Sequence, residues 1–252
     1  NITPGGDTDC AQANTAMFLA GGFMSKNVSH TIAAVARAIA GARSLVAIEC
    51  GATGPTKDCG YENPIVKAIA SVPICAEGKN ATCAHADLMG NLTAGVCDVW
   101  SNESVYNREE MGGPTPGVWL QSLGYECALM NTAKQIGTAK ELRDSYVLAD
   151  KYRDPQGVIL AYDNAYRIGE AIVADGEDNY LRARAAALKA MDCINEAVDA
   201  KRIYLTRFER DTLDSTYKTY EQLPDDSDKF LQTCIKRYSR KVKEHDIKQY
   251  DL

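Results

Sequence analysis

Residues 44–50 read SLVAIEC, and the glycine-containing loop GATGPTKDCG follows them at residues 51–60. A short, near-continuous apolar run that ends in such a loop is typical of a parallel strand covered on both faces. Similar runs occur at residues 72–77 (VPICAE) and 96–100 (VCDVW), and residues 1–3 resemble the end of a further strand. Helical patterns alternate with these runs at about residues 9–24, 29–42, 63–70 and 81–93. Strands that alternate with helices predict βαβ units and a parallel sheet.

The number of strands limits how much of a barrel the chain can hold. A complete (β/α)8 barrel takes about 250 residues, which is close to the 252 of this chain. However, three convincing strands and one stub amount to about half a barrel, and no strand pattern follows Trp100. We therefore predict an α/β fold in which residues 1–115 form the C-terminal portion of a TIM (β/α)8 barrel.

The second part of the chain is predicted to be all-helical, from residue 116 to residue 252. The segment GGPTPG at residues 112–117 separates it from the first part, because glycine and proline interrupt regular structure. The helical patterns span about residues 117–136, 139–153, 157–174, 178–201, 206–222 and 226–243. Apolar residues in the fourth pattern recur at intervals that place them on one face: Leu181, Ala185, Leu188, Met191, Ile194 and Val198. Two helix starts are visible as capping signals, at Ser29 and at Asn63-Pro64.

The composition and net charge of the chain limit the classes of partner that it is expected to bind. The chain is 45% hydrophobic and has a net charge of -6, so its electrostatics favour neither nucleic acid nor an anionic membrane. Charges at Lys26, Arg37 and Asp163 interrupt the most apolar windows, and we expect no membrane span. The nine cysteines lack the dense spacing of a disulfide scaffold, which predicts reduced thiols and a cytoplasmic protein.

Cys10 and Cys59 are the candidate metal ligands. Cys10 follows GGDTD at residues 5–9 and begins a helical pattern, where backbone amides and the helix dipole stabilise a thiolate. Cys59 lies in the loop after the predicted strand at residues 44–50, so both loops are expected at the C-terminal face of the barrel, where active sites form. The wide spacing alone favours buried structural thiols. Asp9 and Asp58 are candidates to orient a ligand or supply a proton, although helix capping is the simpler interpretation.

The sequences GGDTDCAQANTAMFLAGGFM (residues 5–24) and ECGATGPTKDCGYENP (residues 49–64) resemble the zinc-ligand loops of the methanol:corrinoid methyltransferase family of methanogenic archaea. The resemblance extends over the whole chain. It implies a TIM barrel with zinc held by two cysteines and one glutamate. The cysteines correspond to Cys10 and Cys59, and the glutamate to a position upstream of Asn1, so that Glu49, Glu62 and Glu77 are not its equivalents. Residues 1–252 alone should accordingly bind zinc poorly.

The family's activity implies the remaining expectations. It transfers the methyl group of methanol to cobalt(I) of a corrinoid carried by a separate protein, and it implies a homodimer within a heterotetramer. Two other functions stay open: a helical docking or dimerisation module without activity of its own, and a thiolate-zinc methyltransferase that acts on a thiol or a methylamine. Cys75, Cys83 and His85 form an alternative metal cluster, for which structural thiols are the favoured interpretation.

Overall fold

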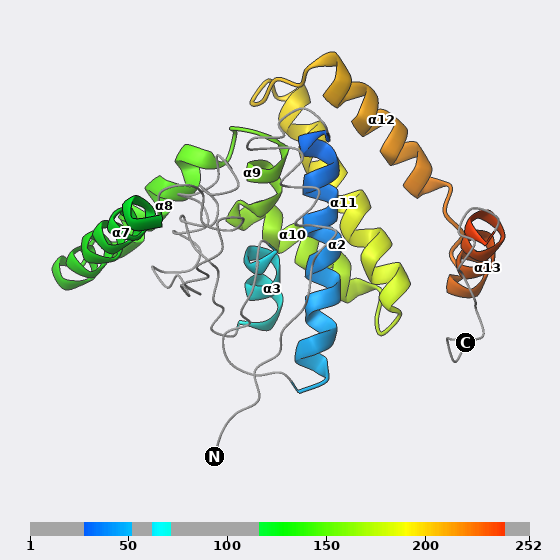
Figure 1. The fold of residues 1–252 in the computed structure, drawn as a ribbon, viewed down its shortest axis with the longest axis horizontal. Helices are drawn as coiled ribbons and strands as arrows, with labels where there is room; N and C mark the ends of the chain where they lie inside the picture. Colours follow the sequence, from blue (N-terminus) through cyan, green and yellow to red (C-terminus); the bar gives the residue numbers. More distant parts are fainter. Residues whose placement is uncertain (1–27, 52–61, 72–115, 240–252) are drawn as a thin grey trace.

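The computed structural model describes residues 28–51, 62–71 and 116–239, and these ranges hold helices and turns with no strand among them. The helices are α2 (His30–Glu49), α3 (Asn63–Ala70), α7 (Pro116–Ile136), α8 (Ala139–Asp150), α9 (Pro155–Leu160), α10 (Tyr162–Ala174), α11 (Asn179–Asp199), α12 (Arg207–Glu221) and α13 (Ser227–Tyr238). In Figure 1, α2 lies at the centre, α7 and α8 extend to one side, and α12 and α13 to the other. The helices α3, α9, α10 and α11 contact α2 directly.

Helix α2 is the central packing element of the described residues. It is rich in alanine, and Ala33, Ala34 and Ala38 are fully buried. Small side chains let neighbouring helices approach closely: a Cβ added at Gly41 would lie 3.0 Å from Ile65 Cγ2 of α3. By length and composition α2 could cross a membrane, but 61% of its apolar window is buried inside the protein, as in the core helix of a soluble fold.

The start of α2 is held by two sets of hydrogen bonds. Ser29 caps the helix, and its Oγ accepts from the amide of Ile32, as its sequence pattern predicts. The carboxylate of Glu209 on α12 accepts from the Ser29 hydroxyl, the His30 amide, and both the amide and the hydroxyl of Thr31. An acidic group is favourable at a helix N-terminus, where amides lack intrahelical partners. Glu209 therefore joins α12 to α2.

One apolar core joins these helices. Its largest fully buried apolar side chains are Ile65, Ile159, Leu160, Ile168, Ile172, Met191, Ile194 and Leu213. Burying one such side chain stabilises the fold by about 1.5–3 kcal/mol. The predicted apolar face of α11 is confirmed for Met191 and Ile194, whereas Leu181, Ala185, Leu188 and Val198 are only half-buried.

The prediction of a strand at residues 44–50 is wrong. Residues 44–49 form the last part of α2, and Cys50 is its C-cap. The sequence predicted that this helix would end at residue 42, whereas it continues to Glu49. An apolar run of seven residues is compatible with either a strand or a buried helix, and periodicity cannot separate them. Ser44 and Leu45 are buried against neighbouring helices, so packing selects the helical form.

The other helical predictions that fall on the described residues are confirmed, with two differences. Residues 63–70 are helical as predicted, although the N-cap residue is Glu62 and not Asn63. The helix predicted over residues 157–174 is divided into α9 and α10 by an extended residue, Ala161. The Asn164 side-chain amide donates to the Val158 carbonyl across the break, so this carbonyl keeps a hydrogen-bond partner. The predicted strands at residues 1–3, 72–77 and 96–100, and the predicted helices at residues 9–24 and 81–93, lie outside the described residues.

Candidate functional site

The predicted ligands Cys10 and Cys59, and the neighbouring carboxylates Asp9 and Asp58, lie outside the described residues. So do the alternative cluster residues Cys75, Cys83 and His85. Within the described part of the chain, no three His, Cys, Asp or Glu side chains gather as a metal site would require. The structure does describe both ends of the segment that carries Cys59, namely Gly51 and Glu62, and these ends define the candidate site.

The first end of this segment leaves the C-terminus of α2. Cys50 is the C-cap residue, and Gly51 follows with a φ of 94°, a conformation that glycine adopts without strain. The preceding residue, Glu49, forms a bidentate ion pair with Arg182 of α11. Arg182 Nη1 lies 2.7 Å from Oε2 and Nη2 lies 2.9 Å from Oε1. Hydrogen bonding from Arg182 lowers the pKa of the Glu49 carboxyl.

Arg182 is itself held by its surroundings. Its side chain is only 7% exposed. Besides Glu49, its guanidinium donates to the Gly176 carbonyl and to the Asn179 side chain. Because a planar guanidinium has donors in a fixed geometry, these contacts fix the direction in which it presents its remaining donors to Glu49. The C-terminal end of α2 is thus joined to α11 by the ion pair between Glu49 and Arg182.

The second end of the segment is the buried carboxyl of Glu62. Glu62 is 2% exposed, and its Oε1 accepts a hydrogen bond of 2.5 Å from the Ser44 hydroxyl of α2. Its other oxygen, Oε2, is buried and has no hydrogen-bond partner among the described residues. Burial raises the pKa of this carboxyl, and the Ser44 hydrogen bond opposes the shift in part. The segment is therefore followed by a carboxyl whose ionisation is disfavoured by its burial.

Four cysteines fall within the described residues, and none of them forms a disulfide there: Cys50, Cys127, Cys193 and Cys234. Cys193 is buried in the core, and burial raises its pKa to about 11. A thiol with so high a pKa is a poor nucleophile and a poor metal ligand, since both roles need the thiolate. Cys193 is thus a structural core residue.

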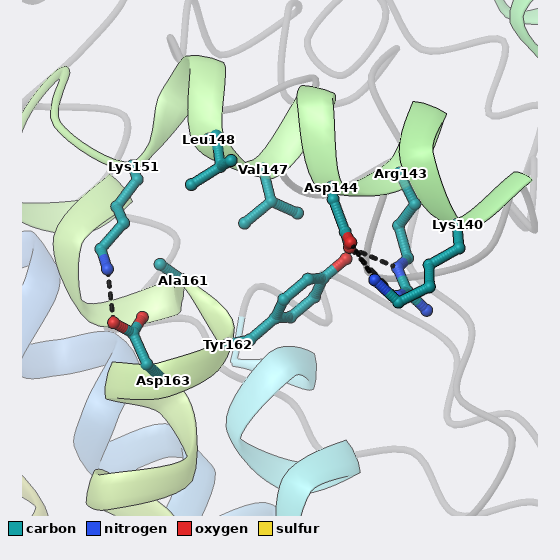
Figure 2. A pocket seen from close by; sticks show the side chains of 9 residues that line it. All are labelled: Lys140, Arg143, Asp144, Val147, Leu148, Lys151, Ala161, Tyr162 and Asp163. Carbon is teal, nitrogen blue, oxygen red and sulfur yellow. Dashed lines mark hydrogen bonds and ion pairs between the residues drawn. The ribbon is translucent and has the colours of Figure 1, made fainter. Parts of the chain in front are cut away.

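A surface pocket of about 400 Å³ lies between α8 and the start of α10 (Figure 2). Figure 2 shows Tyr162 below α8, with Asp144 near its hydroxyl end. Lys140 and Arg143 both pair with Asp144, and Lys151 pairs with Asp163. Hydrogen bonding from Lys140 lowers the pKa of Asp144. All the charged side chains of this lining are held in ion pairs, three cations against two carboxylates, and no serine, cysteine or histidine lines the pocket, so its chemistry does not indicate catalysis.

Sequence reasoning missed the four residues at the ends of the Cys59 segment. On sequence grounds Glu49 and Glu62 are only excluded as equivalents of the family's glutamate ligand, and neither Ser44 nor Arg182 carries a recognisable signal. No sequence signal joins Glu49 to a residue as distant as Arg182, because the pair depends on the packing of α2 against α11. In the structure, both oxygens of Glu49 accept hydrogen bonds from Arg182.

Comparison with known proteins gives consistent matches. Residues 1–251 match the family described as "Methanol-cobalamin methyltransferase B subunit". The chain is 56% identical over 238 residues to the methanol–corrinoid protein co-methyltransferase of Methanosarcina barkeri (strain Fusaro / DSM 804), and the match covers 94% of this chain and 51% of that relative.

A solved structure matches as well. It is the crystal structure of the methanol:cobalamin methyltransferase complex MtaBC from Methanosarcina barkeri, with a TM-score of 0.86 and 54% identity over 98% of this chain and 54% of the solved chain. The chain thus spans about half the length of both relatives. The family match extends over nearly the whole chain, and we conclude that the chain belongs to the methanol-cobalamin methyltransferase B subunit family.

Proposed function

We propose that this chain is part of a zinc-dependent enzyme that transfers the methyl group of methanol to cobalt(I) of a corrinoid protein. The observation that carries the proposal is the 56% identity to a methanol–corrinoid protein co-methyltransferase. In this reaction the methyl carbon leaves the methanol oxygen and joins cobalt, while the oxygen takes up a proton and departs as water. Cobalt(I) supplies the electron pair of the new bond.

Cys10 and Cys59 are the residues to which we assign metal binding. Two thiolates and one carboxylate form a donor set that suits zinc and leaves a fourth position for the alcohol oxygen. Zinc held by these residues would supply Lewis-acid chemistry to the alcohol. This help is needed because hydroxide is a very poor leaving group. Asp9 and Asp58 are proposed to orient the ligands or to supply the proton.

The partner is proposed to be a corrinoid protein, as the name of the solved relative complex suggests for that complex. We further propose a homodimer within a heterotetramer, a cytoplasmic location, and a partial TIM barrel for residues 1–115. A monomeric mass of the complete polypeptide in light scattering would contradict the dimer.

The test uses Cys10→Ala and Cys59→Ala variants of the complete native polypeptide. Each variant should lose its zinc and more than about 100-fold of the methanol-dependent methylation of cob(I)alamin, because removing a group that only supports a metal ligand already costs about 10–100-fold. Zinc is measured by metal analysis and methylation by the cobalt absorbance spectrum. Cys193→Ala is the matched control, because this buried thiol should leave both readings unchanged.

Two results would contradict the proposal. Zinc that remains bound in both variants would show that the ligand assignment is wrong. Methylation that proceeds with a thiol or a methylamine in place of methanol would favour the alternative thiolate-zinc methyltransferase.

A further inference from the structure

A chain of three polar side chains joins α2 to α9. Nε of Arg37, on α2, donates to Oε1 of Gln156 on α9 at 2.6 Å. Nε2 of Gln156 lies 3.0 Å from Nδ1 of His30, at the start of α2. Arg37 and Gln156 are each 1% exposed, whereas the His30 side chain is 31% exposed. The chain therefore runs from the core to a histidine ring that solvent reaches.

The chemistry of Arg37 fixes where the proton of the His30 ring lies. A guanidinium group has donors only, so the Gln156 atom that faces it is the amide oxygen. The amide nitrogen of Gln156, which is a donor, consequently faces Nδ1 of His30. Nδ1 must then accept, and the proton of the neutral ring is on Nε2. The chain of Arg37, Gln156 and His30 therefore requires an uncharged imidazole.

Protonation of His30 is incompatible with this chain. An imidazolium carries hydrogen on both nitrogens, so its Nδ1–H would point at the amide nitrogen of Gln156, donor against donor. Gln156 cannot reverse its amide, because the same nitrogen would then face the donor of Arg37. The carboxylate of Asp154, the N-cap residue of α9, is the alternative acceptor. Its Oδ2 lies 4.0 Å from Nδ1 of His30.

The charged groups around His30 come from three elements. Asp154 caps α9, and Glu209 of α12 accepts from the backbone amide of His30 at 2.6 Å. Both carboxylates favour a positive ring. Arg37 of α2 opposes a positive ring through Gln156. Among the described residues, these are the charged groups that contact His30 or its hydrogen-bond partner. The ring thus lies between a chain that needs it neutral and two carboxylates that favour its charge.

We propose that His30 is a pH-sensitive switch at the junction of α2 and α9. In its neutral form it accepts from Gln156 and completes the chain to Arg37. In its protonated form it releases Gln156 and pairs with Asp154. Histidine side chains change charge between about pH 5 and 8, so the exchange of partners occurs under mild conditions. The switch involves no residue assigned to the metal, and it stands or falls independently of the proposed function.

The experiment follows His30 in the complete native polypeptide by hydrogen–deuterium exchange at Cε1 of the ring, measured by mass spectrometry of its peptide. The rate of this exchange changes as the imidazole titrates, which gives a midpoint pH for the ring. Gln156→Glu replaces the donor that faces Nδ1 by a carboxylate oxygen and leaves an acceptor for Arg37. The midpoint should rise by about one pH unit or more, because a carboxylate then faces the ring.

Asp154→Asn tests the second partner of the switch. Asparagine keeps an oxygen that can cap α9, but it removes the charge that pairs with the imidazolium. The midpoint of His30 should therefore fall by about one pH unit. The two variants shift the midpoint in opposite directions, so a general loss of structure cannot produce both results.

Gln135→Glu is the matched control for the change in net charge. Gln135 is exposed on α7, which extends to one side of α2 (Figure 1), and its substitution should leave the midpoint of His30 unchanged. A rise as large as that of Gln156→Glu would show a general effect of charge and overturn the switch. An unchanged midpoint in Gln156→Glu, or in Asp154→Asn, would show that His30 does not exchange these partners and would overturn it as well.

Discussion

At the scale of single residues, Glu62 places an ionisable carboxyl in a buried environment. Its carboxyl is 2% exposed, with one oxygen hydrogen-bonded to Ser44 and the other without a partner among the described residues. Transfer of a carboxylate from water into such a site is unfavourable, and the pKa is raised for this reason. The raised pKa has a direct consequence for stability.

Glu62→Gln should become progressively more stable than the wild type as the pH rises. The carboxyl pKa in the folded protein lies above the unfolded value of 4.5. The stability that this group contributes is therefore complete below that value, and it is lost as the pH rises through the folded pKa. Glutamine does not ionise and avoids this loss. Tm of both proteins, measured in a chelator from about pH 5 to about pH 8, tests the expectation.

The control for this pH series is Asp214→Asn, which changes an exposed residue on α12. Its Tm should remain at a constant difference from the wild type over the same range. A constant difference between Glu62→Gln and the wild type would contradict a raised pKa at Glu62.

At the scale of elements, the junction between α8 and α9 depends on close backbone contact. Asp154 caps α9 and accepts from the amides of Gln156 and Gly157. A Cβ added at Gly157 would lie 2.4 Å from the backbone oxygen of Asp150 at the end of α8. Gly124 in α7 has no atom within 4 Å of the corresponding point. The backbone around Gly157 therefore leaves no room for a side chain, whereas that around Gly124 does.

Gly157→Ala should destabilise the protein by about 2 kcal/mol, because the added methyl group overlaps rigid backbone atoms and forces α8 and α9 apart. Gly124→Ala should be stabilising by about 0.5 kcal/mol, since alanine favours an exposed helix position more than glycine does. Urea unfolding of both variants measures the two free energies. Equal effects on stability would show that α8 can shift to accept the methyl group.

At the scale of the whole molecule, α2 connects the parts of the described structure. Its N-terminal end binds Glu209 of α12, its middle packs on α3 through Gly41, and its C-terminal end pairs with Arg182 of α11. Figure 1 shows α2 between these helices. In the sequence, the segment that carries Cys59 follows this helix.

The zinc content of residues 1–252 should depend on what else the polypeptide contains. The family resemblance assigns the third ligand, a glutamate, to a position upstream of Asn1. We expect a polypeptide of residues 1–252 to hold well under one zinc per chain, and an extended polypeptide that includes the matching upstream residues to hold one. Metal analysis of both proteins provides the measurement. Equal zinc contents would place the full ligand set within residues 1–252, and Cys75, Cys83 and His85 would become the next candidates.

The sequence by itself determined the helical content of residues 116–239, because amphipathic periodicity and capping residues are local signals. The helix at residues 63–70 and the Ser29 cap were predicted for the same reason, and both are confirmed. The loops around Cys10 and Cys59 were sufficient to indicate the family, which the match over residues 1–251 confirms. The assignment of these cysteines to zinc stays a prediction.

Only the tertiary structure decided between a strand and a helix for residues 44–50, because an apolar run carries no period that separates the two. It also decided the break at Ala161, where Asn164 satisfies the freed carbonyl of Val158. The pairing of Glu49 with Arg182, and of Ser44 with Glu62, depends on which helices pack side by side. Such contacts join residues far apart in the sequence, and the free energy that selects them arises from the burial of all the helices together.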